Sequence, residues 1–168
     1  MDLDSLASIA EIIGGIAVLV SLVFVIVSIR QNTTSQRALA VDSLTAAITA
    51  INVPAIESPK VGLAVAKASS DWQAASHEER AIAHYFLFSI FKLWENAWYL
   101  KQSSVLDEGQ WVGWETMLRK YYHAKGIREV WWPSRRAAFS PEFQQFLAGT
   151  KPTEDIGELT DIFGQAQE

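Results

Sequence analysis

Few side chains in this sequence have the type and spacing that chemistry requires. Two of the three histidines, His77 and His84, are seven residues apart and would share one face of a helix, whereas His123 stands much further along the chain. A metal centre in a helical bundle uses convergent Glu-x-x-His pairs, and the sequence has none. We therefore predict no metal and no cofactor. Haem ligation by His84 and His123 stays open, with no motif to support it.

The next candidates are polar residues within an aromatic run, "WENAWY". Buried polar groups are costly unless they are paired, so Glu95 and Asn96 are expected to make hydrogen bonds that fix helix register. His84, also among aromatic residues, is expected to be a hydrogen-bonded core or boundary residue. The alternative is a pocket containing His84, Glu95 and Asn96 with an acid of perturbed pKa. With no cysteine, no phosphate loop and no nucleophile elbow, an enzyme is not indicated, although one stays open.

A third candidate is the stretch from 111 to 136, which carries six Lys or Arg against two Glu and is interleaved with Trp and Tyr. Such a mixture suits an anionic lipid surface, where each basic residue contributes about 1 kcal/mol. The alternative interpretation places the tryptophans in the core and the basic residues on a solvated face. The formal net charge of −5 argues against nucleic acid as a partner. The lipid-surface candidates are Arg119, Lys120, Arg128, Trp131, Trp132, Arg135 and Arg136.

The element that would position everything else is the first apolar segment. The eighteen residues from Ile12 to Ile29 carry no charge, with Glu11 directly before them and Arg30 directly after. About 20 apolar residues cross a bilayer core, and a soluble core helix rarely runs this long without a polar face. A secretory signal needs a basic start and small residues before the cleavage point, and neither is present. The segment therefore predicts a single transmembrane helix.

Orientation follows from the basic residues near the ends of this helix. Arg30 and Arg37 lie on its C-terminal side, and no Lys or Arg precedes it. Because basic residues favour the cytoplasmic side, we predict an outside N-terminus and a cytoplasmic C-terminal region. For Glu11 we favour an interfacial role, near headgroups and near a helix N-terminus where negative charge is stabilised. The alternative is an intramembrane polar site for an ion or a proton.

Small residues follow helical spacing along the same segment. In lipid, small residues let helix backbones approach closely, and packing then drives association. We call this set the small-residue seam and predict that it is a helix–helix interface between copies of the chain. The alternative is chance, since such residues are common in spans. The seam consists of Ala10, Gly14, Ala17, Ser21 and Ser28.

After the span, helix signals follow one another without a strand pattern. A helical stripe continues to Pro54, with an optional bend near 32–35, and a short helix covers 59–69. Cap signals at Ser76, Asp107 and Ser140 predict helices over 77–102, 107–123 and from 141 to Gly149, and a short helix before Pro133 fits between them. The fold class is all-α: one transmembrane helix (1–30), a bundle of five or six helices (31–149) and an acidic flexible tail (150–168).

Three blocks resemble a family of short bacterial membrane proteins without assigned function: "SIAEIIGGIAVLVSLVFVIVSIRQNT", "WENAWYLKQSSVLDEGQW" and "FSPEFQQFL". These blocks are architectural and cover most of the chain. The resemblance implies a bacterial inner-membrane protein with an α-helical cytosolic domain, and it implies no substrate, cofactor or mechanism.

Three function classes remain. The favoured one is a membrane-anchored, non-enzymatic, homo-oligomeric interaction or scaffold protein, with membrane lipids and its own copies as partners and any other protein partner unknown. The second is a small oligomeric ion channel whose pore is lined by Ser21, Ser28 and Glu11. The third is an enzyme with a site in the helical bundle near His84 and Glu95.

Overall fold

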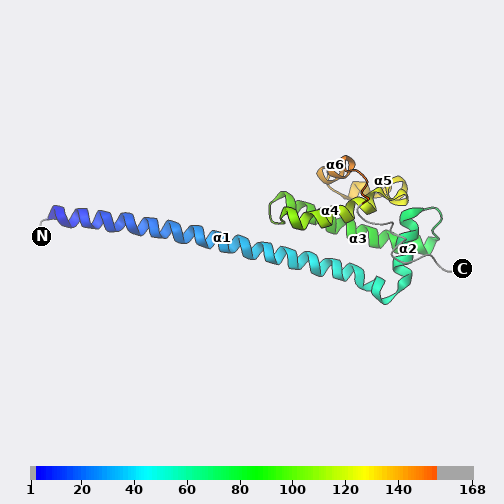
Figure 1. The fold of residues 1–168 in the computed structure, drawn as a ribbon, viewed down its shortest axis with the longest axis horizontal. Coiled ribbons are helices and arrows are strands. Elements are labelled where there is room, and N and C mark those ends of the chain that lie inside the picture. The colour runs from blue at the N-terminus through cyan, green and yellow to red at the C-terminus, as the bar shows by residue number, and fades with distance from the viewer. Residues whose placement is uncertain (1–2, 155–168) are drawn as a thin grey trace. The chain divides into compact units, whose positions relative to one another are not determined.

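The computed structural model describes residues 3–154, with side chains from residue 11 onward, and this part of the chain is all-helical (Figure 1). The predicted fold class, a long apolar first helix followed by a helical domain, is confirmed. Residues 3–154 contain no strand. The elements are α1 (Leu3–Glu57), α2 (Pro59–Ser70), α3 (His77–Gln102), α4 (Glu108–His123), the π-helical turn η1 (Ile127–Trp131), α5 (Trp132–Arg135), the 3-10 turn η2 (Arg136–Ala138) and α6 (Pro141–Gly149).

The first helix is longer than the sequence suggests. It runs for 55 residues without a break at 32–35, and it continues past Pro54 to Glu57. The prediction that Pro54 ends the helix is therefore wrong. A proline lacks the N–H that its own turn would use, but its carbonyl still accepts, here from the N–H of Ser58 at 3.0 Å. By internal contacts the chain divides into two units, Met1–Leu39 and Ala40–Glu168, later than the expected boundary at residue 30.

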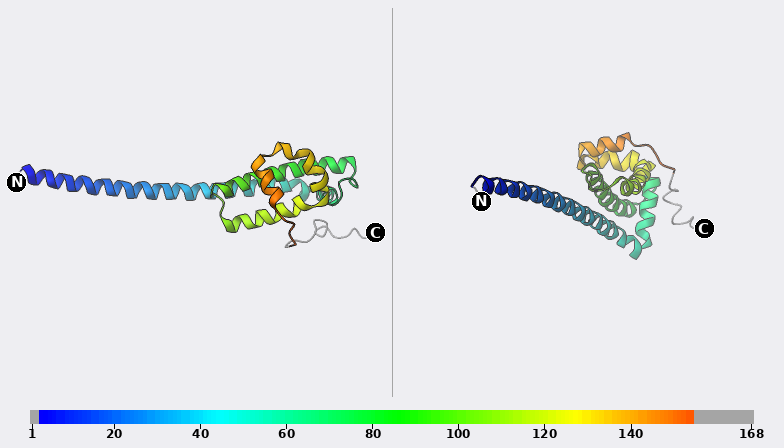
Figure 2. Two further views of the ribbon diagram at one scale, coloured as in Figure 1. Left: turned by 90° about the horizontal axis from the view of Figure 1, so that it is seen from above. Right: turned by 60° about the vertical axis from the view of Figure 1, so that its left-hand side comes forward.

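Within the second unit, two helices begin at N-cap residues that the sequence predicts. At the start of α3 the N–H of Glu79 donates to Ser76 Oγ at 3.2 Å, and the N–H of Ser76 donates to Glu79 Oε2 at 2.6 Å. At the start of α4 the N–H of Gln110 donates to Asp107 Oδ1 at 2.8 Å. These bonds satisfy backbone donors that the first turn of a helix leaves unpaired. The helices α3 and α4 form an antiparallel hairpin, and α2 packs against α3 (Figure 2).

The chain after α4 passes very close to the backbone at the end of α2. A Cβ atom at Gly126 would lie 2.0 Å from the carbonyl oxygen of Ala68 at the end of α2, so only glycine fits there. The π-helical turn η1 follows, and its wider winding leads directly into α5. Pro133 stands in the first turn of α5 and so helps to start this helix rather than end the preceding one.

Aromatic side chains from α3, η1, α5 and α6 build the core of this unit. Phe91 is fully buried, and its ring centroid lies 5.1 Å from those of both Trp94 and Trp131. Trp132 and Phe139 have ring centroids 5.0 Å apart. Such pairs add roughly 0.5–1.5 kcal/mol each beyond the area that they bury.

Candidate functional site

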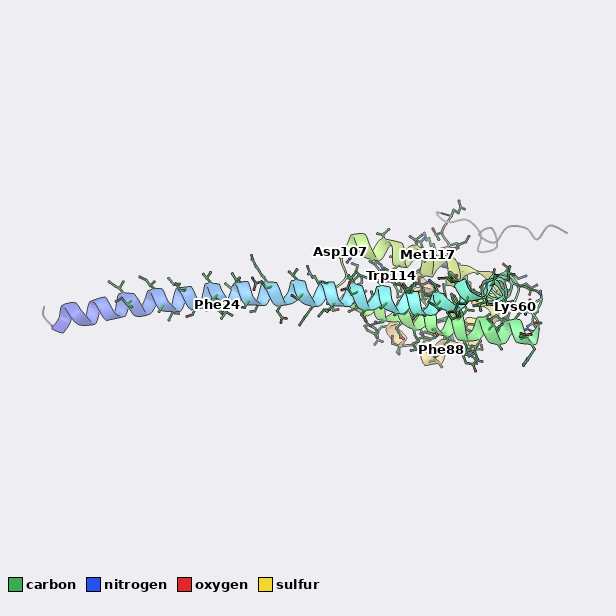
Figure 3. The ribbon with its side chains drawn as sticks, turned by 90° about the horizontal axis from the view of Figure 1, so that it is seen from below. Phe24, Lys60, Phe88, Asp107, Trp114 and Met117 are labelled. Carbon is green, nitrogen blue, oxygen red and sulfur yellow. The ribbon has the colours of Figure 1, made fainter. Side chains whose placement is uncertain are left out.

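The apolar first part of α1 has no cover within its own unit. Every residue from Ile12 to Ile29 is exposed, and Phe24 (labelled in Figure 3) is 72% exposed. Among the described residues, this is the one helix that is long and apolar enough to cross a membrane. A contiguous exposed apolar surface of this kind is typical of a segment that contacts a membrane or another protein.

The small-residue seam falls on one face of this helix. A Cβ atom built at Gly14 or Gly15 has nothing within 4 Å, so the face is open for the approach of another helix. The hydroxyl of Ser21 donates to the carbonyl oxygen of Ala17 at 2.8 Å. That bond satisfies the hydroxyl donor within the helix, as an apolar surrounding requires. The side chain of Ala10 lies outside the described residues.

Glu11 is placed well inside the helix rather than at its start. The first helical residue is Leu3, so Glu11 lies about 12 Å further along the axis at 1.5 Å per residue. The charge effect of a helix terminus fades within about one turn. Stabilisation by the N-terminus of α1 is therefore not an explanation for this glutamate, and the interfacial role would rest on headgroups alone.

Glu95 is buried, and both of its carboxylate oxygens have hydrogen-bond partners. Its Oε2 lies 2.7 Å from Lys92 Nζ, and its Oε1 accepts from the N–H of Ser140 at 2.7 Å. Lys92 Nζ also donates to the carbonyl oxygen of Ala138 at 2.6 Å and lies 4.5 Å from the ring centroid of Phe139. Burial alone would raise the pKa of Glu95, but the bonds from Lys92 and Ser140 outweigh it and hold the pKa below its usual range. The glutamate thus ties the middle of α3 to the start of α6.

The other two residues of the expected pocket do not join Glu95. Asn96 is exposed, so the pocket of His84, Glu95 and Asn96 is not formed. His84 is half-buried, and its Nδ1 accepts from the indole N–H of Trp131 at 3.2 Å, which places the ring proton of the neutral form on Nε2. Burial, with the charge of Arg135, lowers the pKa of His84. The histidine is therefore a hydrogen-bonded boundary residue.

A contact set around the end of α6 was missed by the sequence reasoning. His123 Nε2 lies 3.0 Å from Thr150 Oγ1, and Arg119 Nε donates to the carbonyl oxygen of Lys151 at 2.8 Å. Thr153 is buried. The segment 150–153, expected to begin a flexible tail, is thus held against α4, whereas residues 155–168 lie outside the described part. No local pattern announces these contacts, because the partners are about 30 residues apart along the chain.

The basic and aromatic stretch separates into two kinds of residue. Trp131 is 1% exposed and Trp132 is 6% exposed, so these two lipid-surface candidates do not contact lipid, and of the two interpretations the core one holds for them. Their burial follows from η1 and α5, which direct both rings toward Phe91. Arg119 and Lys120 are half-buried on α4. The arginines that remain exposed are Arg128, Arg135 and Arg136.

A cavity of about 290 Å³ lies on the opposite side of α3 from Glu95. Its walls come from the last part of α1, from α3 and from α4, and Figure 3 labels two of its residues on α4, Trp114 and Met117. The spacing of Phe86, Ile90 and Trp94 was a signal for this face, since i, i+4, i+8 positions line up on a helix. The full lining is Ile48, Asn52, Phe86, Ile90, Trp94, Gln110, Gly113, Trp114, Met117 and Tyr121.

Comparison with known proteins adds no further constraint. No protein family, no curated protein and no solved structure matches the chain. In the described part of the chain, no three His, Asp or Glu side chains come together as a metal site. The candidate functional features are thus separate ones: the exposed apolar part of α1 in the first unit, and the exposed arginines and the cavity in the second.

Proposed function

We propose that this chain is a membrane-anchored, non-enzymatic interaction protein that assembles with copies of itself. The observation that carries the proposal is the uncovered run from Ile12 to Ile29, eighteen residues without a charge and with every side chain exposed. In water such a surface would aggregate, whereas in lipid it is solvated along its whole length. The helical domain that follows then stays at the membrane, where it can meet a partner.

The orientation that we propose has the N-terminus outside and the domain in the cytoplasm. Arg30 and Arg37 follow the apolar run, and residues 1–29 contain no Lys or Arg. Basic residues near a span favour its cytoplasmic side. The resemblance to short bacterial membrane proteins makes the bacterial inner membrane the proposed location.

Self-assembly is supported by the seam on α1. Between helices in lipid there is no hydrophobic driving force, because lipid tails are as apolar as leucine. Close packing must therefore supply the energy, and small residues on one face permit it. Gly14 leaves its face open, and Ser21 has its hydroxyl bonded within the helix, so neither obstructs a neighbouring helix.

A non-enzymatic role is supported by what the polar residues of the domain do. Glu95 joins α3 to the start of α6, His84 accepts from Trp131, and His123 contacts Thr150. Each of these groups has a structural partner that accounts for its position. The bonds from Lys92 and Ser140 hold down the pKa of Glu95, whereas burial is the main cause of the lowered pKa of His84 and of His123. The domain is therefore proposed to act through its surface rather than through a reacting group.

Anchoring and orientation can be tested together, because the chain has no cysteine. Single cysteines at Asp2, Val23 and Lys60 would be treated with a membrane-impermeant maleimide in intact cells. We expect labelling at Asp2 alone. After the membrane is permeabilised without detergent, Lys60→Cys should also react, since this side chain is exposed on α2, whereas Val23→Cys should react only after denaturation.

The contradicting outcomes are specific to each position. Reaction of Lys60→Cys in intact cells, with Asp2→Cys protected, would reverse the orientation. Reaction of Val23→Cys in native membranes would show that water reaches the middle of the apolar run, and the proposal that lipid and packed helices surround this run would have to be abandoned.

A further inference from the structure

The cavity between the last part of α1, α3 and α4 has uncharged walls. None of its ten lining residues is an Asp, Glu, Lys, Arg or His. Its one ionisable group is the phenol of Tyr121, and burial raises the pKa of this group, so it stays neutral near neutral pH. A charged ligand would leave its solvation here without compensation. The occupant that the walls accept is uncharged.

The walls also have a distinct shape. Four aromatic side chains come from two helices, Phe86 and Trp94 from α3, Trp114 and Tyr121 from α4. The ring centroids of Trp94 and Tyr121 are 5.3 Å apart with planes inclined at 56°, so the rings form a corner rather than a stack. Flat rings gain from offset or edge contacts with such surfaces, by roughly 0.5–1.5 kcal/mol per pair beyond apolar burial.

The lining of the cavity also contains polar side chains. Within residues 11–154, neither the indole N–H of Trp114 nor the hydroxyl of Tyr121 makes a hydrogen bond. The side-chain amides of Asn52 and Gln110 are likewise without a protein partner in the described part of the chain, and both are exposed. A mostly apolar cavity with a few polar groups in its lining is the usual form of a small-molecule site.

We infer that this cavity binds a small, uncharged molecule with a flat ring and one hydrogen-bonding group. The ring lies in the corner formed by Trp94 and Tyr121, and the polar group faces the free donors and acceptors of the lining. The site belongs to the domain alone, since every lining residue falls between Ala40 and Glu168, and it is independent of the membrane anchor.

The test uses the full chain in nanodiscs, with its seven tryptophans replaced by 5-fluorotryptophan and observed by fluorine NMR. The probe is 2-naphthol, a neutral flat ring with one hydroxyl, and the matched probe is 1-octanol, a neutral chain with the same group. Because α1 contains no tryptophan, partition of either probe into lipid does not move these resonances directly. We expect 2-naphthol to shift the Trp94 and Trp114 resonances saturably, to leave the Trp132 resonance in place, and to bind about ten-fold or more tighter than 1-octanol.

A matched pair of glycine variants locates the binding. A Cβ atom at Gly113 meets nothing within 4 Å, so Gly113→Leu should place a side chain in the cavity without disturbing the fold. Gly109→Leu, on the same helix but outside the lining, is the control, with only an ordinary 3.5 Å contact to Asp107 Oδ1. Gly113→Leu should weaken 2-naphthol binding by about ten-fold or more, and Gly109→Leu by less than about two-fold.

Three results would overturn the inference. The first is the absence of a saturable shift at Trp94 and Trp114 up to the solubility of 2-naphthol. The second is equal binding of 2-naphthol by the two glycine variants, which would place it elsewhere. The third is equal affinity for 1-octanol, which would make the cavity a site for an apolar chain rather than for a ring.

Discussion

Two helices with many large apolar side chains, the first part of α1 and α3, differ in whether those side chains are buried. In the first part of α1, Phe24 is 72% exposed, whereas in α3 Phe91 is completely buried. The difference between them is where polar side chains occur. The run from Ile12 to Ile29 has no charge, while α3 carries Lys92 and Glu95 in its middle. The charged groups of α3 have hydrogen-bond partners in the folded domain, and without these partners their burial would be costly. The apolar run of α1 has no such groups and needs only an apolar surrounding.

Gly126→Ala should have the largest effect, because it should destabilise the helical domain and leave the first part of α1 unchanged. The new Cβ atom would lie 2.0 Å from the carbonyl oxygen of Ala68, which belongs to backbone and cannot move aside. We expect the domain to lose about 3 kcal/mol or more of unfolding free energy, at the upper end of what overpacking costs. Urea unfolding followed by tryptophan fluorescence measures this, and membrane insertion of α1 should not change.

The control is Gly113→Ala on α4, where the Cβ atom has nothing within 4 Å. Alanine is favoured over glycine in a helix by up to about 1 kcal/mol, so this variant should be neutral or slightly stabilising. Equal stability of the two variants would mean that the close passage of Gly126 past α2 does not occur.

The next effect concerns the polar bonds that distinguish α3 from α1. Glu95→Leu removes the acceptor of the Ser140 N–H and the partner of Lys92. We expect a loss of about 1–3 kcal/mol, most of it from the unpaired backbone donor, since Lys92 is partly exposed and can reach water. Asn96→Leu, one residue further and exposed, should stay within about 0.5 kcal/mol of the wild type. A cost as large at residue 96 as at residue 95 would contradict the assigned network.

The smallest effect is a pH dependence confined to the domain. The pKa of His84 is lowered from 6.5, chiefly by burial, so the unfolded chain binds more protons than the folded chain just below that value. The stability contributed by neutral His84 is complete above 6.5 and is lost as the pH falls through the lower folded value. Urea midpoints at about pH 7.5 and about pH 5.5 should therefore differ more in the wild type than in His84→Gln.

The glutamine variant keeps an acceptor for the indole N–H of Trp131 but cannot be protonated. His123 has a lowered pKa of the same sign and is present in both proteins, so the comparison isolates His84. An identical loss of stability at the lower pH in the two proteins would mean that His84 does not contribute to the pH dependence.

The sequence predicts the features of the fold that depend on residues close together along the chain. The caps at Ser76, Asp107 and Ser140 were read correctly because a cap joins residues only three positions apart. The end of the first helix was misread, because Pro54 is tolerated where the helix is about to stop. The burial of Trp131 and Trp132 was left open, since it depends on a π-helical turn that no residue pattern announces.

The site was less predictable than the fold because its contacts are distant along the chain. Glu95 and Asn96 are polar neighbours, and the backbone contact that holds Glu95 comes from Ser140, 45 residues further along the chain. The cavity needs residues from three helices, so the pattern of any one helix shows only part of it. The seam on α1 is visible in the sequence, but the partner that we propose for it is another copy of the chain, which one chain does not contain.

The central claim is that the uncovered part of α1 both anchors the chain and holds its copies together, and mass in nanodiscs tests it most directly. Gly14→Leu fills the seam, while Val23→Leu adds similar bulk about 180° away on the same helix, and leucine is favourable in lipid at both positions. We expect an oligomeric wild type, an association constant lowered about ten-fold or more in Gly14→Leu, and no change in Val23→Leu. A monomeric wild type, or equal assembly of the two variants, would contradict the claim.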